Sequence, residues 1–273
     1  MADGVAIKKG ALTGLLLLDI GGGLLVGLIL LALATLAARA IERPDVLVST
    51  IGDSTVWNAI LTTFAAAFLA VILLALLGTP LAYLMARSRN RALPLVEALV
   101  DLPLVLPHTI AGLLVYLVFM RYGPLGQPLG ALGFSFEDAF FGIVAAMLFV
   151  GIPYYVDAAR DGFAKVPIEL EEVARTLGAG PQAAFLRIAL PLAARECLSG
   201  AITAWGRAVG EFAAVVMIAY YPLVVSTLVY TRFTQYGLAD TVAVAIILLV
   251  ACGGVLVLLR RAATRLWRPD APA

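Results

Sequence analysis

Residues 54–86 read STVWNAILTTFAAAFLAVILLALLGTPLAYLMA and contain no Asp, Glu, Lys or Arg. A helix needs about 20 consecutive apolar residues to cross a bilayer, so this stretch is long enough to span a membrane. Of the 273 residues, 62% are hydrophobic and 14% are charged, and the mean hydropathy is +1.01. Soluble domains carry about 25% charged residues. The composition therefore indicates an integral membrane protein and excludes an ordinary cytosolic enzyme. The net charge of +1 predicts no nucleic-acid partner.

Other apolar stretches extend the same pattern over the whole chain. Together with residues 54–86, they predict six transmembrane helices, over 20–38, 54–86, 102–120, 139–156, 197–222 and 241–259. The first follows Lys8 and Lys9 and is longer than the core of a signal peptide, so we expect it to be retained. Residues 223–236 predict an external re-entrant or interfacial helix, or else a partial seventh span. We therefore expect an all-α, polytopic membrane protein with a single transmembrane domain over residues 1–273.

Basic residues set the expected orientation, because cytoplasmic loops carry an excess of Lys and Arg. With the N-terminus inside, fourteen of the 19 basic residues are cytoplasmic. They are Lys8, Lys9, Arg87, Arg89, Arg91, Arg160, Lys165, Arg175, Arg187, Arg195, Arg260, Arg261, Arg265 and Arg268. Four are external (Arg39, Arg43, Arg121 and Arg232), and Arg207 lies within a span. The pattern predicts a multi-pass plasma-membrane protein with both termini in the cytoplasm.

The inner segment 160–195 is long, charged and rich in helix formers. Pro167 is suited to begin a helix, and Gly178 is suited to end one. We therefore expect a short cytoplasmic helix over about 168–177 that docks to a soluble partner. The residues expected to take part are Glu169, Glu171, Glu172, Ala174, Arg175 and Gly178.

Two features inside the spans are candidates for a translocation path or gate. Arg207 and Glu211 are four residues apart and so share one helix face, and charges within a span usually mark a pathway or a partner. Pro103 and Pro107 each remove a backbone hydrogen bond, and the run continues into His108 and Thr109. The alternatives are an ion pair that only locks helix packing and a kink without a function.

Catalytic and metal sites are not expected. No GxxxxGK[ST] loop is present to hold a nucleotide phosphate. His108 is the only histidine, which cannot form a zinc site alone and is expected to be a polar group at a helix end. Cys197 and Cys252 lie in apolar runs and are expected to be buried small hydrophobes.

The inner segment also carries a longer pattern, E-x-A-x-x-x-G-x9-I-x-L-P, made by Glu172, Ala174, Gly178, Ile188, Leu190 and Pro191. It resembles the "EAA" loop of permease subunits of ABC importers, with Val173 in place of the first alanine. Three further stretches, 78–83 (GTPLAY), 102–112 (LPLVLPHTIAG) and 206–212 (GRAVGEF), resemble molybdate, tungstate and sulfate permeases. Phe212 favours the molybdate/tungstate branch, and residues 219–222 (AYYP) are most similar to its archaeal members.

The resemblance implies a type I ABC importer permease fold, in which residues 160–195 form the coupling loop. It implies a homodimer of this chain, two cytoplasmic ABC ATPase subunits that bind ATP and magnesium, and an extracytoplasmic oxyanion-binding protein. No cofactor is expected in this chain itself. The expected function is import of molybdate or tungstate; a sulfate/thiosulfate permease, an ion-coupled secondary transporter and an intramembrane enzyme remain as alternatives.

Overall fold

The computed structural model describes residues 3–88 and 90–266, with side chains described for 21–88 and 90–263. Helices form almost all of this part of the chain, and no strand occurs in it. The helices are α1 (Asp3–Glu42), α2 (Pro44–Ile51), α3 (Ser54–Arg87), α4 (Leu93–Val105), α5 (His108–Phe119), α6 (Gly126–Ala131), α7 (Phe140–Lys165), α8 (Ile168–Thr176), α9 (Pro181–Ala184), a π-turn (Phe185–Ala189), α10 (Leu190–Val209), α11 (Ala213–Ile218), α12 (Val225–Tyr236) and α13 (Leu238–Leu266). Arg89, Arg268 and the side chains of Lys8, Lys9 and Arg265, which contribute to the expected orientation, lie outside the described residues.

Four helices of the described chain are long and apolar enough to cross a membrane. They are α3, α7 and the apolar parts of α1 (Gly21–Glu42) and α13 (Leu238–Ala263). They match the first, second, fourth and sixth stretches predicted from the sequence, and the all-α multi-pass class is confirmed. The other two predicted spans are interrupted, so the number of membrane crossings stays a prediction.

The predicted span 102–120 is divided into α4 and α5, whose axes differ in direction by 116°. Pro107 causes the break, because its ring disfavours the helical conformation in the preceding residue. Leu106 accordingly takes the extended conformation, with φ −71° and ψ 137°. Pro103 lies one turn earlier, buried within α4, which continues past it. The expected kink is thus a sharp turn at the second proline, with His108 as the first residue of α5.

The predicted span 197–222 is divided in the same way. Helix α10 begins earlier, at Leu190, and ends at Val209; the chain then turns through Gly210 before α11 begins at Ala213. Residues 223–236 include α12, a helix of 12 residues, which is too short to cross a bilayer by itself. The interfacial or re-entrant helix and the partial seventh span therefore both stay predictions.

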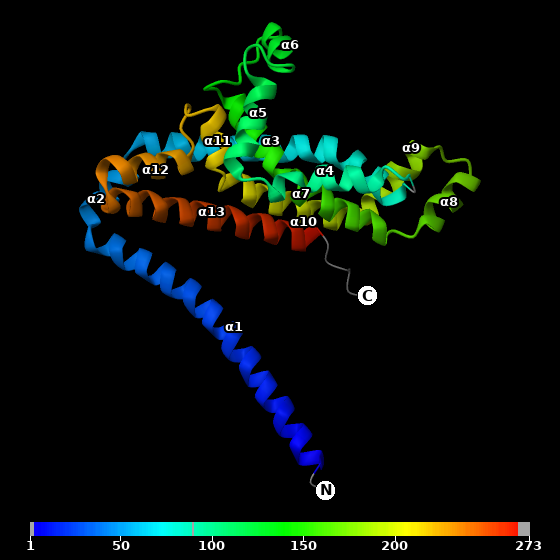
Figure 1. Cartoon of the computed structure of the whole chain (residues 1–273), viewed down its shortest axis with the longest axis horizontal. Helices are drawn as coiled ribbons and strands as arrows, with labels where there is room; N and C mark the ends of the chain where they lie inside the picture. Colours follow the sequence, from blue (N-terminus) through cyan, green and yellow to red (C-terminus); the bar gives the residue numbers. More distant parts are fainter. Residues whose placement is uncertain (1–2, 89, 267–273) are drawn as a thin grey trace. The chain divides into compact units, whose positions relative to one another are not determined.

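Small side chains allow α3, α7 and α10 to pack closely. The core between them contains Ala66, Ala67, Ala70, Ala146 and Ala204, all fully buried. Glycines extend this packing: a Cβ atom at residue 200 would lie 2.8 Å from the Cβ of Ala158. Small residues at helix contacts are typical of membrane bundles, where close backbone approach replaces the hydrophobic effect as the source of association. Figure 1 shows α5 leaving this layer, with α6 at its far end.

The described chain divides into two compact units. The first contains residues 3–53 and 232–247, and the second contains 54–88, 90–231 and 248–266. Within the first unit, Arg232 forms ion pairs with Asp53 and with Asp240, the latter at 3.8 Å. The candidate sites described below all lie in the second unit.

Close packing of α5 against α11 gives a test of this arrangement. A Cβ atom at residue 112 would lie 2.6 Å from the backbone oxygen of Ala214, so Gly112→Ala must separate the two helices. We expect a lower midpoint of thermal unfolding in detergent, with a loss of about 1–3 kcal/mol of stability. Gly253→Ala is the matched control, because α13 has open space around Gly253 and alanine favours a helix. Equal midpoints for both variants would contradict the packing described here.

Candidate functional site: a docking helix and a charged cluster at two helix breaks

Helix α8 corresponds to the helix predicted over about 168–177, and its observed bounds, Ile168–Thr176, agree closely. Its C-terminal end is closed by two backbone hydrogen bonds, from Gly178 N–H to Arg175 O (3.0 Å) and from Ala179 N–H to Ala174 O (2.9 Å). This is a Schellman motif, which needs a left-handed residue just after the helix. Gly178 supplies it with a φ of +92°. The prediction that Gly178 ends this helix is confirmed.

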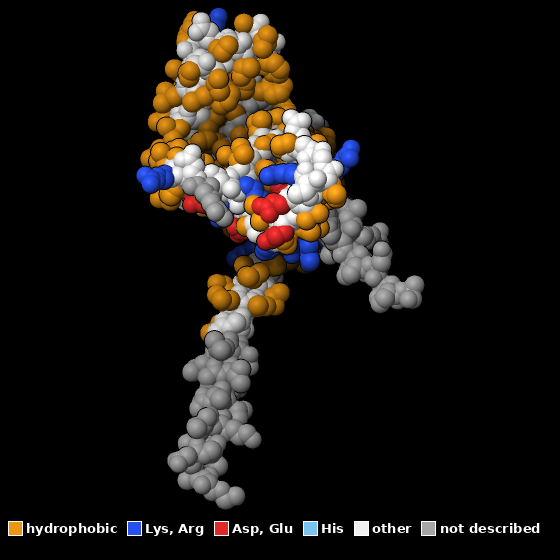
Figure 2. Space-filling model, turned by 90° about the vertical axis from the view of Figure 1, so that its right-hand side faces the viewer, with side chains coloured by type: hydrophobic (Ala, Val, Ile, Leu, Met, Phe, Trp, Pro, Cys, Tyr) orange, Lys and Arg blue, Asp and Glu red, His pale blue; other side chains and the backbone are white. Residues whose placement is uncertain are grey.

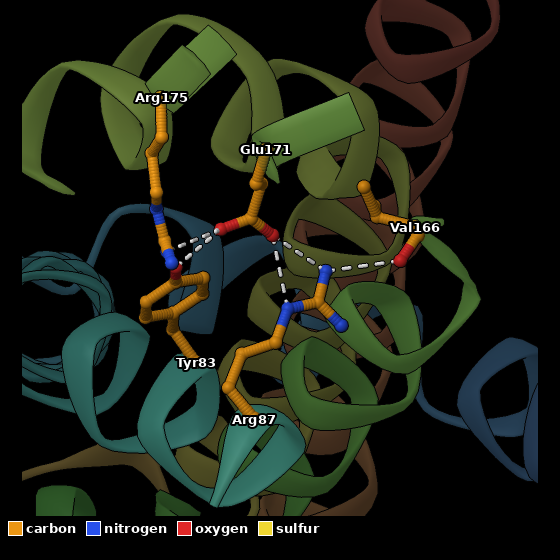
Figure 3. Close-up of polar contacts among 5 residues, drawn as sticks. All are labelled: Tyr83, Arg87, Val166, Glu171 and Arg175. Atoms are coloured by element: carbon orange, nitrogen blue, oxygen red, sulfur yellow. Dashed lines mark hydrogen bonds and ion pairs between the residues drawn. The ribbon is translucent and has the colours of Figure 1, made fainter. Parts of the chain in front are cut away.

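The carboxylate of Glu171 fixes α8 to the end of α3, as Figure 3 shows. Arg87 donates to its Oε1 from Nε (2.9 Å) and from Nη2 (2.7 Å), and Tyr83 Oη donates to its Oε2 (2.5 Å). Arg87 Nη2 also donates to the carbonyl of Val166, just before α8 (2.9 Å). Arg175 Nη2 lies 3.7 Å from Glu171 Oε2. Since the Glu171 side chain is 0% exposed, these bonds supply its charge with the partners that burial requires.

The exposed face of α8 therefore differs from the expected one. Glu171 points into its own chain and cannot pair with a docking partner, because its side chain is fully enclosed. Glu169, Glu172 and Arg175 are exposed, and Ala174 is half-buried. Figure 2, which looks toward the end of the molecule that carries α8, shows acidic and basic side chains gathered there. The exposed face of α8 thus carries one acidic pair and one arginine around a small residue.

A second cluster forms where the two broken spans meet. Arg207 Nη2 lies 2.6 Å from Glu211 Oε2 and 2.8 Å from His108 Nε2, and His108 Nδ1 lies 3.6 Å from the same Glu211 oxygen. The guanidinium can only donate, so the histidine nitrogen that it meets accepts. Arg207 belongs to the last turn of α10, Glu211 to the turn before α11, and His108 to the start of α5. The cluster thus joins both breaks.

Glu211 is the centre of this cluster and is 2% exposed. Its Oε1 accepts a hydrogen bond from the backbone N–H of Ala214 (2.9 Å). This N–H lies in the first turn of α11, where backbone donors have no partner within the helix. Its backbone carbonyl accepts a hydrogen bond from the hydroxyl of Ser226 (2.8 Å). The carboxylate therefore neutralises an arginine and caps a helix, and the backbone carbonyl of the same residue binds the segment that contains Ser226. The paired arginine accounts for a buried charge within the bundle.

The remaining candidates are distributed around the same break. Thr109 is exposed in the first turn of α5, and Pro103 is buried one turn before the break. His108 is the helix-end polar group that the sequence predicted. Its association with Arg207 was not predicted, since the two residues are 99 positions apart. Tyr83 and Arg87 were also missed as partners of α8; their i, i+4 spacing at the end of a span was the available signal.

Loss of the Glu171 charge gives the first prediction for this site. Glu171→Gln leaves the guanidinium of Arg87 without its counter-charge, at a cost of about 3–5 kcal/mol. We expect α8 to detach locally, so that hydrogen–deuterium exchange over residues 168–176 rises while exchange in α7 stays unchanged. Glu172→Gln, an exposed neighbour, is the control and should leave exchange as it is. Protection equal to that of the wild type in Glu171→Gln would refute the anchoring role.

The charged cluster gives a separate prediction. Glu211→Ala removes both the counter-charge of Arg207 and the cap of α11, so the midpoint of thermal unfolding should fall, with a loss of about 3–5 kcal/mol. Glu211→Gln keeps an acceptor for the Ala214 N–H and should be intermediate. Glu42→Ala breaks the exposed pair with Arg39 and should change stability by less than about 1 kcal/mol. Wild-type stability in Glu211→Ala would show that the cluster is not structural.

Comparison with known proteins agrees with this architecture. Residues 78–266 match the model of the family "binding-protein-dependent transport system inner membrane component". The chain is 37% identical to the molybdate/tungstate transport system permease protein WtpB of Thermococcus kodakarensis, over 88% of this chain and 92% of that protein. It is 31% identical to a protein of Anthoceros angustus described as a probable sulfate transport system permease, over 89% of this chain and 86% of that protein.

Among solved structures, the bacterial alginate ABC transporter in complex with its periplasmic protein has a chain with the same fold. The TM-score is 0.69 at 16% identity, over 86% of this chain and 88% of that chain. This likeness confirms the ABC importer permease fold that the loop pattern predicted. With its interrupted spans, its short helix α8 and a family match that covers most of its length, this chain belongs to the binding-protein-dependent transport system inner membrane components and is a multi-pass permease subunit.

Proposed function

We propose that this chain is the transmembrane permease of an ABC importer for tetrahedral oxyanions, with molybdate or tungstate as the substrate. The observation that carries the substrate class is the 37% identity to the WtpB protein over 88% of this chain. The motif of residues 206–212 supports it, because its arginine and glutamate form the charged cluster at the meeting of the two breaks. A sulfate or thiosulfate permease is the alternative, supported by the relative of Anthoceros angustus. It ranks second because that relative is less similar to this chain, at 31% identity.

The partners follow from the same proposal. Two copies of this chain would form the pore, two cytoplasmic ATPase subunits would bind ATP and magnesium, and an extracytoplasmic protein would deliver the oxyanion. The chain of the alginate transporter that shares this fold was solved in complex with a periplasmic protein, which supports the last of these. The basic residues favour cytoplasmic termini, so α8 would face the ATPase.

Coupling would run through α8 to the membrane helices. ATP binding closes the ATPase pair and moves the docked helix, and alternating access then exposes the pore to each side in turn. The bonds from Glu171 to Arg87 and Tyr83 provide the connection, because they join α8 to α3 by charge-assisted hydrogen bonds. A displacement of α8 would therefore pull on a long helix of the core rather than on a loose loop.

Reconstituted complexes test both substrate and coupling. In proteoliposomes that contain the permease, its ATPase and the binding protein, ATP hydrolysis and uptake should rise when the binding protein is loaded with tungstate or molybdate. Gly178→Val forces a β-branched residue to a φ of +92°, at a cost of about 1–3 kcal/mol. It should reduce ATPase association, or leave hydrolysis without uptake, while the permease still inserts. Ala174→Asp should have the same effect by blocking close approach.

Gly180→Val is the matched control, because Gly180 has an ordinary extended conformation (φ −69°, ψ 165°) and open space around it. It should retain near-normal uptake. A response only to sulfate-loaded binding protein would reject the molybdate/tungstate assignment, and uptake without ATP would favour an ion-coupled transporter. Normal ATPase association and uptake in both Gly178→Val and Ala174→Asp would reject α8 as the docking helix.

A further inference from the structure

A cavity of about 360 Å³ lies between α10 and α13, apart from both sites described above. One face of α10 forms one wall, since its lining residues are spaced by three and four positions. The end of α13 forms the other wall. The lining residues are Arg195, Leu198, Ser199, Ile202, Thr203, Arg260 and Ala263.

The cavity carries positive charge that the described residues do not neutralise. Neither Arg195 nor Arg260 forms a hydrogen bond or ion pair with any residue in the described part of the chain. Glu196, the acidic residue nearest in sequence to Arg195, binds Lys165 instead (3.3 Å). The two guanidinium groups, which are exposed, therefore offer planar pairs of donors to an anion.

A hydroxyl group adds a further donor to the same wall. Thr203 Oγ1 donates to the carbonyl of Ser199 (3.0 Å) and is thereby occupied. The hydroxyl of Ser199 has no partner among the described residues, and this residue lines the cavity one turn after Arg195. Two guanidinium groups and one hydroxyl are the kind of donor set that binds a tetrahedral oxyanion.

The cavity also lies at the boundary between polar and apolar sequence. Arg195 precedes the apolar stretch that starts at residue 197, and Arg260 follows the one that ends at 259. Leu198 and Ile202 line the cavity beyond the charges, and Val257 and Leu258 are exposed on the neighbouring turn of α13. Charged groups beside exposed apolar ones match a phospholipid, because its charged phosphate lies at the membrane interface, next to its apolar chains.

We propose that this cavity binds a phosphate-like tetrahedral oxyanion at the membrane interface, held by Arg195, Arg260 and Ser199. Two sources share this chemistry: the headgroup phosphate of an anionic phospholipid, and a free oxyanion such as molybdate leaving the pore. The second source rests on the proposed function, and the first does not.

Binding to the purified full-length chain distinguishes the two. Retention of dioleoylphosphatidylglycerol and dioleoylphosphatidylcholine is measured by native mass spectrometry, and binding of sodium molybdate by equilibrium dialysis. The test variant is the double substitution Arg195→Gln, Arg260→Gln. The control is Arg187→Gln, Arg121→Gln, which changes the net charge equally at two exposed residues outside the cavity.

If the lipid is the source, the test variant should retain phosphatidylglycerol roughly tenfold or more weakly than the control, with phosphatidylcholine unchanged. If the free oxyanion is the source, molybdate binding should fall in the test variant while retention of both lipids stays the same. Equal binding of phosphatidylglycerol and of molybdate by the wild type and the test variant overturns the proposal. None of these measurements uses ATP or transport, so their failure is distinct from failure of the proposed function.

Discussion

A bilayer offers no water to an unpaired backbone group or an unpaired charge, and the structure of this chain follows from that constraint. A long helix pairs its backbone N–H and C=O groups internally, as α3 and α7 do. The chain departs from regular helix at Leu106–Pro107 and again at Gly210–Phe212. The two departures are joined by the contact between Arg207 and His108, and α5 packs against α11.

Glu211 shows how the constraint is met at those breaks. Its carboxylate pairs with Arg207 at 2.6 Å and accepts the backbone N–H of Ala214 at 2.9 Å. This one side chain thereby provides a buried partner both for the Arg207 guanidinium and for the first turn of α11. Interrupted helices at membrane depth are tolerated where they are buried in protein or line a cavity. The same arrangement leaves His108 half-buried beside the arginine.

Helix α8 likewise depends on a buried carboxylate that has its partners. Helix α8 is short and polar and would be marginal alone. The buried carboxylate of Glu171, bound by Arg87 and Tyr83 from α3, gives it a fixed position. The packing beyond this anchor is close, because small buried residues bring α3, α7 and α10 together.

Composition and pattern by themselves determined the membrane class, the apolar helices α3, α7 and α13, and the short helix α8 with the glycine that ends it. These depend on local properties: an unbroken apolar run, a proline before a helix, and a left-handed residue after it. The sequence also marked Arg207 and Glu211 as a pair from their spacing, although α10 ends at Val209 and Glu211 lies in the turn beyond it. Only the tertiary structure decided that Pro107 produces a turn of 116°, that His108 meets Arg207, and that Glu171 faces inward. Those outcomes depend on which helices pack together, and contacts between residues 84 and 99 positions apart carry no local signal.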